Sequence, residues 1–447
     1  MENLQKGSKK LLNAWAFYDW ANSVYSLVIT SAIFPIFYGA ITIIKNDEGQ
    51  IISDKVQFLG FNLNNDSLIS YVTALAFLAV SILSPFLSGI SDYVGNKKSF
   101  LKFFCYLGAI SCIGLFWFSL DYLWFGLLCY FLALIGFWSS LVFYNSYLPD
   151  IAFPEQQDKI SAKGFSLGYI GSVILLIICL VMILKFEWFG FEDEGLPTRL
   201  SFVLTGVWWI GFSQYTYYYL PKGNKKQKIT KNVLFNGYKE LRKIWNSLTH
   251  HKRLKRYLVA FFTYSMAVQT VMLIATYFGI EELDWGDQDP TTGLIVSILL
   301  IQLVAVLGAT LTSRLAIVIG NIRTLIILNI FWIVICVYAY FIITPQDFYV
   351  AAAGVGLVMG GIQALSRSTY SKMLPINTLD TASYFSFYDV AEKIGIVIGM
   401  LLYGIVAEIT GSVRSSILFL VIFFVIGVIL LLRVPKEESI KKDPLAA

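Results

Sequence analysis

Apolar segments long enough to cross a membrane recur along the whole chain, and this feature constrains the fold more than any other. Windows of about 19 residues contain twelve such segments, each able to span a hydrocarbon core of roughly 30 Å as a helix. Their approximate limits are 12–43, 68–91, 98–120, 122–148, 162–184, 200–220, 257–280, 292–318, 321–343, 346–373, 383–409 and 412–434. We therefore predict an all-α membrane protein with twelve transmembrane helices.

Composition agrees with a membrane protein and disfavours other classes. Of 447 residues, 57% are hydrophobic and 14% are charged, whereas a soluble domain carries about 25% charged residues. That much apolar surface cannot be hidden inside a soluble globule of this size. A soluble enzyme, a nucleic-acid-binding protein and a disordered protein are all disfavoured, so we expect neither catalysis nor binding to nucleic acid.

The loop charges predict an orientation. If the spans alternate, one side of the membrane receives most of the Lys and Arg, including those of the segments 97–102, 222–256 and 433–442. The other side receives carboxylates: Asp47, Glu48, Asp54, Glu187, Glu192, Asp193, Glu194, Glu281, Glu282, Asp284, Asp287 and Asp289. Because cytoplasmic loops are enriched in Lys and Arg, we expect both termini in the cytoplasm. The short termini and loops favour a bacterial inner membrane over a vacuole.

The longest polar interruption, residues 222–256, divides the chain into six spans and six spans. We expect an N-terminal bundle over 1–221, a C-terminal bundle over 257–447 and a substrate path between them. Within the basic segment 222–256, apolar residues recur at helical intervals, which predicts an interfacial helix. Such a helix could recognise anionic lipid, or it could simply tether the two bundles.

The string Ser88–Lys98 lies between the second and third spans. It resembles the loop signature of the major facilitator superfamily through Asp92, Gly95, Lys97 and Lys98. Gly95 allows a tight turn, and Asp92 can accept hydrogen bonds from the N-terminus of a neighbouring helix. The resemblance implies a gating loop that latches the two halves together; the alternative is a generic charged turn.

The second half contains a degraded copy of this string at residues 308–323. Ile317 stands where the acidic residue would be, although Gly320 and Arg323 persist. An ancient internal duplication would leave such a copy. We expect only the N-terminal half to retain the strong latch.

A narrower resemblance begins at Trp15–Tyr25, the string WAFYDWANSVY. This string is similar to the first-span signature of the vacuole-effluxer-like family of major facilitators, relatives of the autophagy-linked vacuolar amino-acid exporters. Further matches occur in the same order at 143–152, 163–171, 360–368 and 385–395. The seventh span departs from the family pattern, because Tyr264 is followed by Ser265, Met266 and Ala267 and an acidic group is missing.

The resemblance implies a fold of two pseudo-symmetric six-helix bundles with the substrate between them. It also implies alternating access and a small polar organic solute, with amino acids as the first candidates and export as the direction. Two rival functions stay open: an exporter of amphipathic solutes such as drugs or lipids, and a non-transporting membrane sensor or scaffold.

Ionisable residues inside spans are the best guide to a site, because a charge in hydrocarbon persists only beside a partner or a wet cavity. Asp19 shares a helix face with Asn22, while Asp389, Glu392 and Lys393 share another, and Arg367 could pair with Asp389 or Glu392. The alternatives are helix-packing hydrogen bonds and a static ion-pair network. The predicted substrate-binding or coupling residues are Tyr18, Asp19, Asn22, Tyr144, Asn145, Gln363, Arg367, Asp389, Glu392 and Lys393.

No nucleotide-binding loop, nucleophile elbow or cluster of Cys and His ligands is present in the sequence. We therefore expect no cofactor and no metal. Energy would come from an ion gradient or from the gradient of the substrate. A proton is the expected coupling ion, because Asp19, Asp389 or Glu392 could each be neutralised on one side of the cycle. We expect a monomer whose partners are its solute, the proton and the bilayer.

Overall fold

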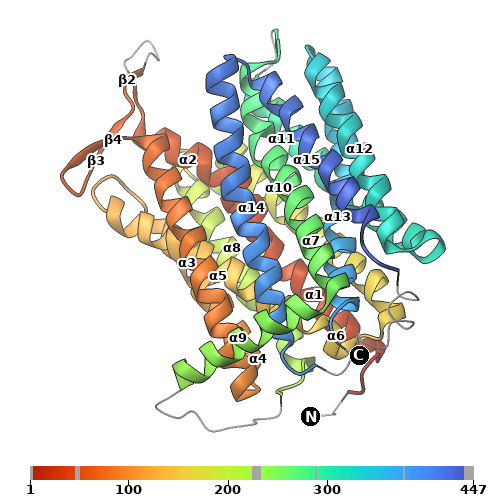
Figure 1. Cartoon of the computed structure of the whole chain (residues 1–447). Helices are drawn as coiled ribbons and strands as arrows, with labels where there is room; N and C mark the ends of the chain where they lie inside the picture. Colours follow the sequence, from red (N-terminus) through yellow and green to blue (C-terminus); the bar gives the residue numbers. More distant parts are fainter. Residues whose placement is uncertain (1–3, 46–50, 224–232, 287–288, 376–377, 437–447) are drawn as a thin grey trace.

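The computed structural model describes residues 4–45, 51–223, 233–286, 289–375 and 378–436. Among the loop charges considered above, those outside these ranges are Asp47, Glu48, Lys225, Lys226, Lys228, Lys231, Asp287 and the tail beyond Lys436. Apart from two short hairpins, the described chain is helical (Figure 1).

The first half of the chain supplies a bundle of long helices. Its elements are α1 (Lys9–Val24), the π-helical segment η1 (Tyr25–Ala32), α2 (Ile33–Thr42), α3 (Asn65–Val94), α4 (Lys97–Gly114), the 3₁₀ turn η2 (Leu115–Trp117), α5 (Leu123–Ser146), α6 (Leu148–Ile151), α7 (Pro154–Leu184), the 3₁₀ turn η3 (Phe186–Phe189) and α8 (Gly195–Tyr219). Strands β1 (Ile44–Lys45) and β2 (Ile51–Ser53) form one antiparallel hairpin, and β3 (Lys55–Phe58) and β4 (Phe61–Asn64) form another.

The second half forms a bundle of its own after the connecting helix α9 (Val233–His250). The elements of this bundle are α10 (Lys252–Glu281), α11 (Pro290–Ile319), α12 (Asn321–Phe341), α13 (Pro345–Lys372), α14 (Thr381–Thr410) and α15 (Val413–Leu432). One hydrophobic core is built almost wholly from the first half and a second from the later helices. The bundles meet where α3 packs on α14 and where α7 packs on α11 and α13.

Each of the twelve predicted spans coincides with a helix, the first of them with α1, η1 and α2 together. Among the described residues, eleven helices are long and apolar enough to cross a membrane. The remaining predicted span corresponds to α8, which is 25 residues long but more polar. Its polar groups are used in packing: Thr216 donates to Ala14 O at 2.7 Å, and Arg199 binds the carbonyl oxygens of Phe116 and Phe118.

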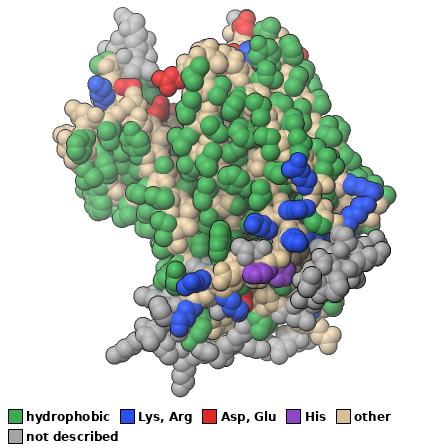
Figure 2. Space-filling model, viewed as in Figure 1, with side chains coloured by type: hydrophobic (Ala, Val, Ile, Leu, Met, Phe, Trp, Pro, Cys, Tyr) green, Lys and Arg blue, Asp and Glu red, His purple; other side chains and the backbone are tan. Residues whose placement is uncertain are grey.

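Charge separates the two ends of the bundle. Figure 2 shows Lys and Arg gathered toward the bottom, Asp and Glu near the top and a broad hydrophobic face between them. The start of α10 and the end of α15 meet at the bottom, where Arg256 donates to Arg433 O at 2.9 Å. We call this the basic end and the opposite one the acidic end. The chain is thus an integral, multi-pass membrane protein.

The connecting helix α9 confirms the helix predicted within 222–256. Ile244 and Leu248 are buried at 2% and 5% exposure, and α9 packs on α3 and on α14. Lys243 forms an ion pair with Asp380 at 3.1 Å, and Ser247 shares a hydrogen bond with Tyr384. The helix is therefore anchored on the basic end of both bundles, while its location at the lipid interface stays a prediction.

The first span is not a continuous α-helix. Residues 25–32 form a π-helical segment in which Ser31 Oγ donates to Ser26 O, five residues earlier, at 3.0 Å. Such segments are hydrogen-bonded from residue i to i+5 instead of i+4, and they occur frequently at functional sites. This one places Ser26 and Leu27 beside the central cavity described below.

Close packing inside the first bundle depends on glycine. Helices α4 and α5 cross at Gly108 and Gly136, where a Cβ built on Gly136 would overlap the backbone of Gly108 and lie 2.8 Å from Phe104 O. Small residues at such crossings let helix backbones approach each other in membranes. Here the neighbouring atoms belong to the backbone and cannot rotate away.

We therefore predict that Gly136→Ala destabilises the protein by about 1–3 kcal/mol, the usual cost of overpacking. The measurement is the melting temperature of the purified protein in detergent. Gly211→Ala on α8 is the matched control, because a Cβ there meets nothing within 4 Å. A melting temperature lowered equally by both variants would contradict this reading of the crossing.

Candidate functional site

A cavity of about 190 Å³ lies between the two bundles. Its polar lining comes from both halves and consists of Asp19, Asn22, Ser23, Ser26, Asn145, Tyr169, Ser172, Tyr264, Ser265, Gln269, Gln302, Gln363, Ser366, Arg367, Tyr388 and Glu392. Its apolar lining consists of Leu27, Phe137, Trp138, Leu141, Phe165, Phe261, Val268, Met359 and Ile362. Polar groups on an otherwise apolar wall are typical of a small-molecule site.

An ion pair crosses between the bundles beside this cavity. Nη2 of Arg367, on α13, lies 3.2 Å from Oδ2 of Asp19, on α1, and the two side chains are 4% and 6% exposed. The hydroxyl of Tyr144 donates to the same Asp19 oxygen at 2.9 Å. Breaking a buried pair by removing one partner is strongly destabilising, because the other charge is left uncompensated.

All three nitrogens of the Arg367 guanidinium donate hydrogen bonds to the first bundle. Nε donates to Ser161 Oγ at 2.9 Å, Nη1 donates to Asn145 Oδ1 at 3.1 Å, and Nη2 also donates to Ser161 O at 3.0 Å. Its centre lies 4.3 Å from the centre of the Phe165 ring. The sequence suggested Asp389 or Glu392 as its partner; the structure pairs Arg367 with Asp19 instead, because α13 faces α1, α5 and α7 at this level.

Gly164 on α7 makes room for this ion pair. A Cβ built on Gly164 would lie 3.2 Å from both Arg367 Nη2 and Tyr144 Oη and closer still to Asp19 Oδ2. One turn further along α7, a Cβ on Gly168 would collide with Ser23 Oγ. Glycine at these two positions therefore lets α7 approach the polar face of α1.

A second charged cluster lies on α14. Lys393 Nζ lies 2.8 Å from Asp389 Oδ1 and 2.8 Å from Glu392 Oε2, and 3.6 Å from the centre of the Trp138 ring in the other bundle. The Lys393 side chain has no exposed surface. Gln269 Nε2 on α10 donates to Glu392 Oε1 at 2.8 Å. The three charged side chains thus share one helix face, as their spacing predicts, and that face touches Trp138.

The predicted site residues fall into two layers. Those that line the cavity are Asp19, Asn22, Asn145, Gln363, Arg367 and Glu392. Those that stand behind it are Tyr18, Tyr144, Asp389 and Lys393, and all four are buried. Tyr144 and Lys393 bind the cavity carboxylates directly, whereas Tyr18 packs on the ring of Tyr144 with centroids 4.8 Å apart.

Sequence reasoning overlooked several lining residues. Tyr169 donates to Gln363 Oε1 across the bundles at 3.0 Å, and Gln302 lines the cavity from α11. Gln302 is a lone polar residue within the apolar string SILLIQLVAVL, a signal that could have identified it. Tyr169 lies within a quoted motif, but nothing in the sequence indicated the direction of its hydroxyl. Met266, in the seventh-span segment that lacks an acidic group, is buried against α14 at Gly399.

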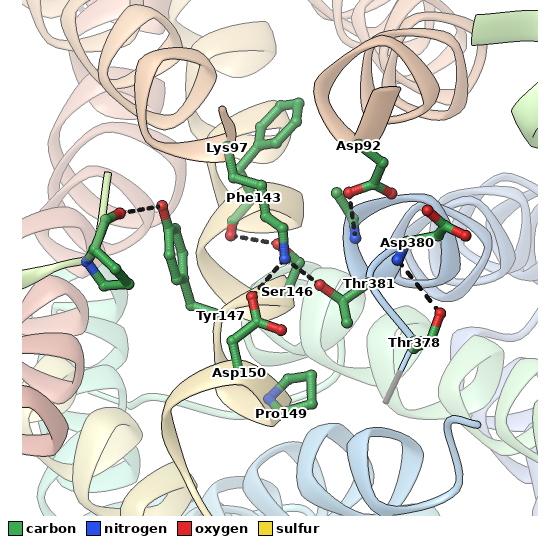
Figure 3. A network of polar contacts seen from close by, with 12 residues as sticks. Asp92, Lys97, Phe143, Ser146, Tyr147, Pro149, Asp150, Thr378, Asp380 and Thr381 are labelled. Carbon is green, nitrogen blue, oxygen red and sulfur yellow. Dashed lines mark hydrogen bonds and ion pairs between the residues drawn. The ribbon is translucent and has the colours of Figure 1, made fainter. Parts of the chain in front are cut away.

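The predicted gating loop joins the bundles at the basic end (Figure 3). Asp92 Oδ2, near the end of α3, accepts hydrogen bonds from the Ser383 amide and the Ser383 hydroxyl at 2.7 Å each. Ser383 lies in the first turn of α14, so the expected contact between Asp92 and a helix N-terminus is confirmed. A carboxylate at this position is also favoured by the helix dipole.

The other residues of the loop hold it in shape. Gly95 ends α3 with φ of 71°, in the left-handed region that glycine tolerates. Lys97 Nζ binds Asp150 Oδ2 at 2.6 Å and also the Thr381 hydroxyl of the second bundle, and Figure 3 shows it between these two partners. Lys98 Nζ donates to Leu220 O at 2.6 Å. Lys98 therefore ties the loop to its own bundle, and Asp92 and Lys97 reach across.

A second cross-bundle contact lies where the degraded copy of the loop ends. Asn321 Nδ2, at the start of α12, donates to Asp158 Oδ1 of α7 at 2.9 Å, and Lys372 forms an ion pair with Asp158 Oδ2. The acidic group missing at Ile317 is thus replaced by one on the opposite bundle. The expectation that only the N-terminal half retains the strong latch stays a prediction, and Asp158, the acidic group of this second contact, also belongs to the N-terminal half.

We predict that Asp92→Ala weakens closure of the basic end. The carboxylate accepts two hydrogen bonds of 2.7 Å, and each bond to a charged group contributes about 1.5–3 kcal/mol. Loss of these bonds should enlarge the open population at least about tenfold. Spin labels on exposed Ser99 and Leu379 would report a longer distance between the basic ends of α4 and α14.

Asp66→Asn is the matched control, because Asp66 is exposed in the first turn of the same helix at the acidic end. The control should leave the distance distribution unchanged. An Asp92→Ala distribution identical to that of the wild type would show that Asp92 does not hold the bundles together.

Sequence comparison identifies the family. The family described as "Vacuole effluxer Atg22 like" matches residues 7–157 and 153–443. The chain is 32% identical to the MFS-type transporter YxiO of Bacillus subtilis (strain 168), over 98% of this chain and 97% of that protein. It is 24% identical to autophagy-related protein 22 of Coccidioides immitis (strain RS), over 99% and 89% of the two chains.

Solved structures share the fold at low sequence identity. The fucose:proton symporter of E. coli superposes with a TM-score of 0.65 at 13% identity, covering 96% of this chain and 98% of the symporter. A bacterial homologue of the iron transporter ferroportin in an outward-facing state gives a TM-score of 0.64 at 13% identity, covering 95% and 98%.

Two bundles with a cavity between them therefore form the major facilitator fold of a transporter, not of an enzyme. The family match covers nearly the whole chain. The chain belongs to the Atg22-like vacuole effluxer family of major facilitator transporters.

Proposed function

We propose that this transporter is a secondary active carrier of a small polar organic solute, with amino acids as the first candidates and export as its net direction. The observation that carries the proposal is the buried Asp19–Arg367 ion pair, which links the two bundles at the wall of the central cavity. A solute bound in that cavity touches both bundles and can bias their relative position.

In this proposal, alternating access requires specific contacts between the two bundles to break. Asp92 contacts α14 and Asp158 contacts Asn321 and Lys372 at the basic end, while Arg367 binds Asp19 at the adjoining wall of the central cavity. Opening that end requires all three groups of contacts to separate. Each group of contacts contains a carboxylate. A proton or a solute that neutralises this carboxylate changes the energy of the contact.

Proton coupling is the proposed energy source. Protonation of Asp19 would remove its attraction to Arg367 and favour separation of the bundles, whereas deprotonation would favour closure. Glu392 lines the same cavity and is held by Lys393 and Gln269, so its charge also senses the contents of the cavity. A carboxylate that is neutral on one side of the cycle and charged on the other couples proton movement to solute movement.

The membrane and its orientation belong to the same proposal. Lys and Arg gather at the basic end, where α9 also lies (Figures 1 and 2). Since cytoplasmic loops are rich in Lys and Arg, we place this end in the cytoplasm of a bacterium and the acidic end outside. The closed basic end then corresponds to a state closed toward the cytoplasm. The proposed unit is the monomer.

Transport by purified protein tests the proposal. Proteoliposomes loaded with a mixed labelled metabolite pool should move one solute class, and an imposed pH gradient should change the rate. Asp19→Asn and Lys393→Ala should each reduce that flux at least about tenfold, because each removes one member of a buried pair, whereas Asp66→Asn at the exposed start of α3 should leave it intact. Correctly folded protein that moves no solute would favour a membrane sensor instead.

One observation favours a second candidate, an exporter of amphipathic solutes. Nine lining residues are apolar, and Phe137, Trp138, Phe165 and Phe261 are aromatic. Competition between the labelled pool and a panel of hydrophobic compounds separates the two candidates. Inhibition by the hydrophobic panel alone would favour the amphipathic solute.

A further inference from the structure

The charges around the central cavity do not balance. The ionisable side chains of α1, α13 and α14 at this level are the carboxylates of Asp19, Asp389 and Glu392 and the basic groups of Arg367 and Lys393. Three acidic groups therefore face two basic ones. A single unbalanced charge in hydrocarbon is costly, so the site is complete only when something positive joins it.

We propose, building on the transport function above, that the cavity carries organic solutes of net positive charge and exchanges each one for a proton. The proton fills the unbalanced position when the cavity is empty of solute. A protonated amine or guanidinium fills it when solute is bound. The two ligands compete for one charge, which makes the exchange electrically neutral for a monovalent solute.

Both basic side chains are already satisfied by the protein. Arg367 donates from all three of its nitrogens, to Ser161, Asn145 and Asp19. Lys393 binds two carboxylates, lies against Trp138 and has no exposed surface. An anionic solute that took the place of Asp19 or Glu392 on these groups would leave that carboxylate buried without a partner. The cavity therefore disfavours anions.

Glu392 is the carboxylate placed to receive the positive group. It lines the cavity, and its side chain is 18% exposed, against 8% for Asp389 and 6% for Asp19. It also shares Lys393 with Asp389, so that one lysine serves two carboxylates. The neutral amide of Gln269 is its other partner and cannot cancel its charge.

Aromatic rings stand next to Glu392 in the wall of the cavity. The rings of Phe261 and Tyr388 stack with centroids 4.0 Å apart, and Tyr264 meets Phe261 edge-on at 5.7 Å. All three residues line the cavity. A carboxylate beside aromatic faces is the chemistry that binds organic cations, since the faces attract positive charge.

Two polar side-chain atoms in the cavity wall are available to bind the uncharged part of the solute. Asn22 is 1% exposed, its Nδ2 has no hydrogen-bond partner among the described residues, and it lines the cavity. Gln302 Oε1 is likewise unpaired and lines the cavity from the second bundle. A buried donor without a partner is costly unless a ligand or water fills its place. These two amides can hold neutral polar groups of a cationic solute.

Flux measured by charge class tests the proposal. Proteoliposomes would receive a labelled mixture of amines, basic, neutral and acidic amino acids, and organic acids. Solutes of net positive charge should move at least about tenfold faster than anions of similar size. The flux of each such solute should be accompanied by a flux of protons across the membrane in the opposite direction. Tyramine, tyrosine and 3-(4-hydroxyphenyl)propionate give a matched series, because they share one ring and differ in charge.

Two variants test whether Glu392 is responsible for the preference for positively charged solutes. Glu392→Gln should abolish the preference for positive solutes and the linked proton flux. Glu408→Gln, exposed on the same helix and outside the cavity lining, should leave both unchanged. If Glu392→Gln does not fold, the comparison of tyramine with 3-(4-hydroxyphenyl)propionate in the wild-type protein is the test, and faster flux of the anion would overturn the charge assignment.

The outcomes separate this inference from the proposed function. Flux confined to neutral or anionic solutes would overturn the charge assignment and leave secondary transport intact. Flux of cations that persists unchanged in Glu392→Gln would also overturn it. An absence of all flux from folded wild-type protein would overturn the transport function and this inference with it.

Discussion

The burial of charge between two helical bundles is the constraint on which the rest of the structure depends. Hydrocarbon tolerates an ionised side chain only beside a partner, so each charge in the middle of this protein fixes a neighbour. Arg367 binds Asp19, Asn145 and Ser161, which lie on three different helices of the opposite bundle. Gly164 is needed at the same point because a side chain there would occupy the space of the ion pair.

This constraint also makes the protein able to switch. The charged contacts across the bundle interface, such as Arg367 with Asp19 and Asp92 with Ser383, can be exchanged for others when a proton or a solute arrives. The hydrophobic cores lie within the bundles, where Gly108 and Gly136 pack backbone against backbone. Rigid bundles joined by exchangeable polar contacts are suited to rocking about a central site.

The sequence predicted the fold well because the bilayer demands long apolar helices. The span limits could be read from hydropathy, and the loop from Asp92 to Lys98 from its resemblance to the major facilitator loop signature. The partner of Arg367 could not, since periodicity within α13 says nothing about which helix of the other bundle it faces. The contact of Asp158 with Asn321 escaped for a similar reason, since nothing in the sequence shows which side chains of the other bundle face α7. The strands at 44–64 and the π-helical segment leave no periodic signal of their own.

The central claim is that the basic end must open and close in every transport cycle. Asp92→Cys combined with Ser383→Cys would place two thiols where a carboxylate now accepts hydrogen bonds from the Ser383 amide and hydroxyl at 2.7 Å. The five native cysteines are buried and should not interfere. Oxidation of this pair in proteoliposomes should stop flux of the labelled metabolite pool, and a reductant should restore it. Undiminished flux through fully cross-linked protein would contradict alternating access at this end.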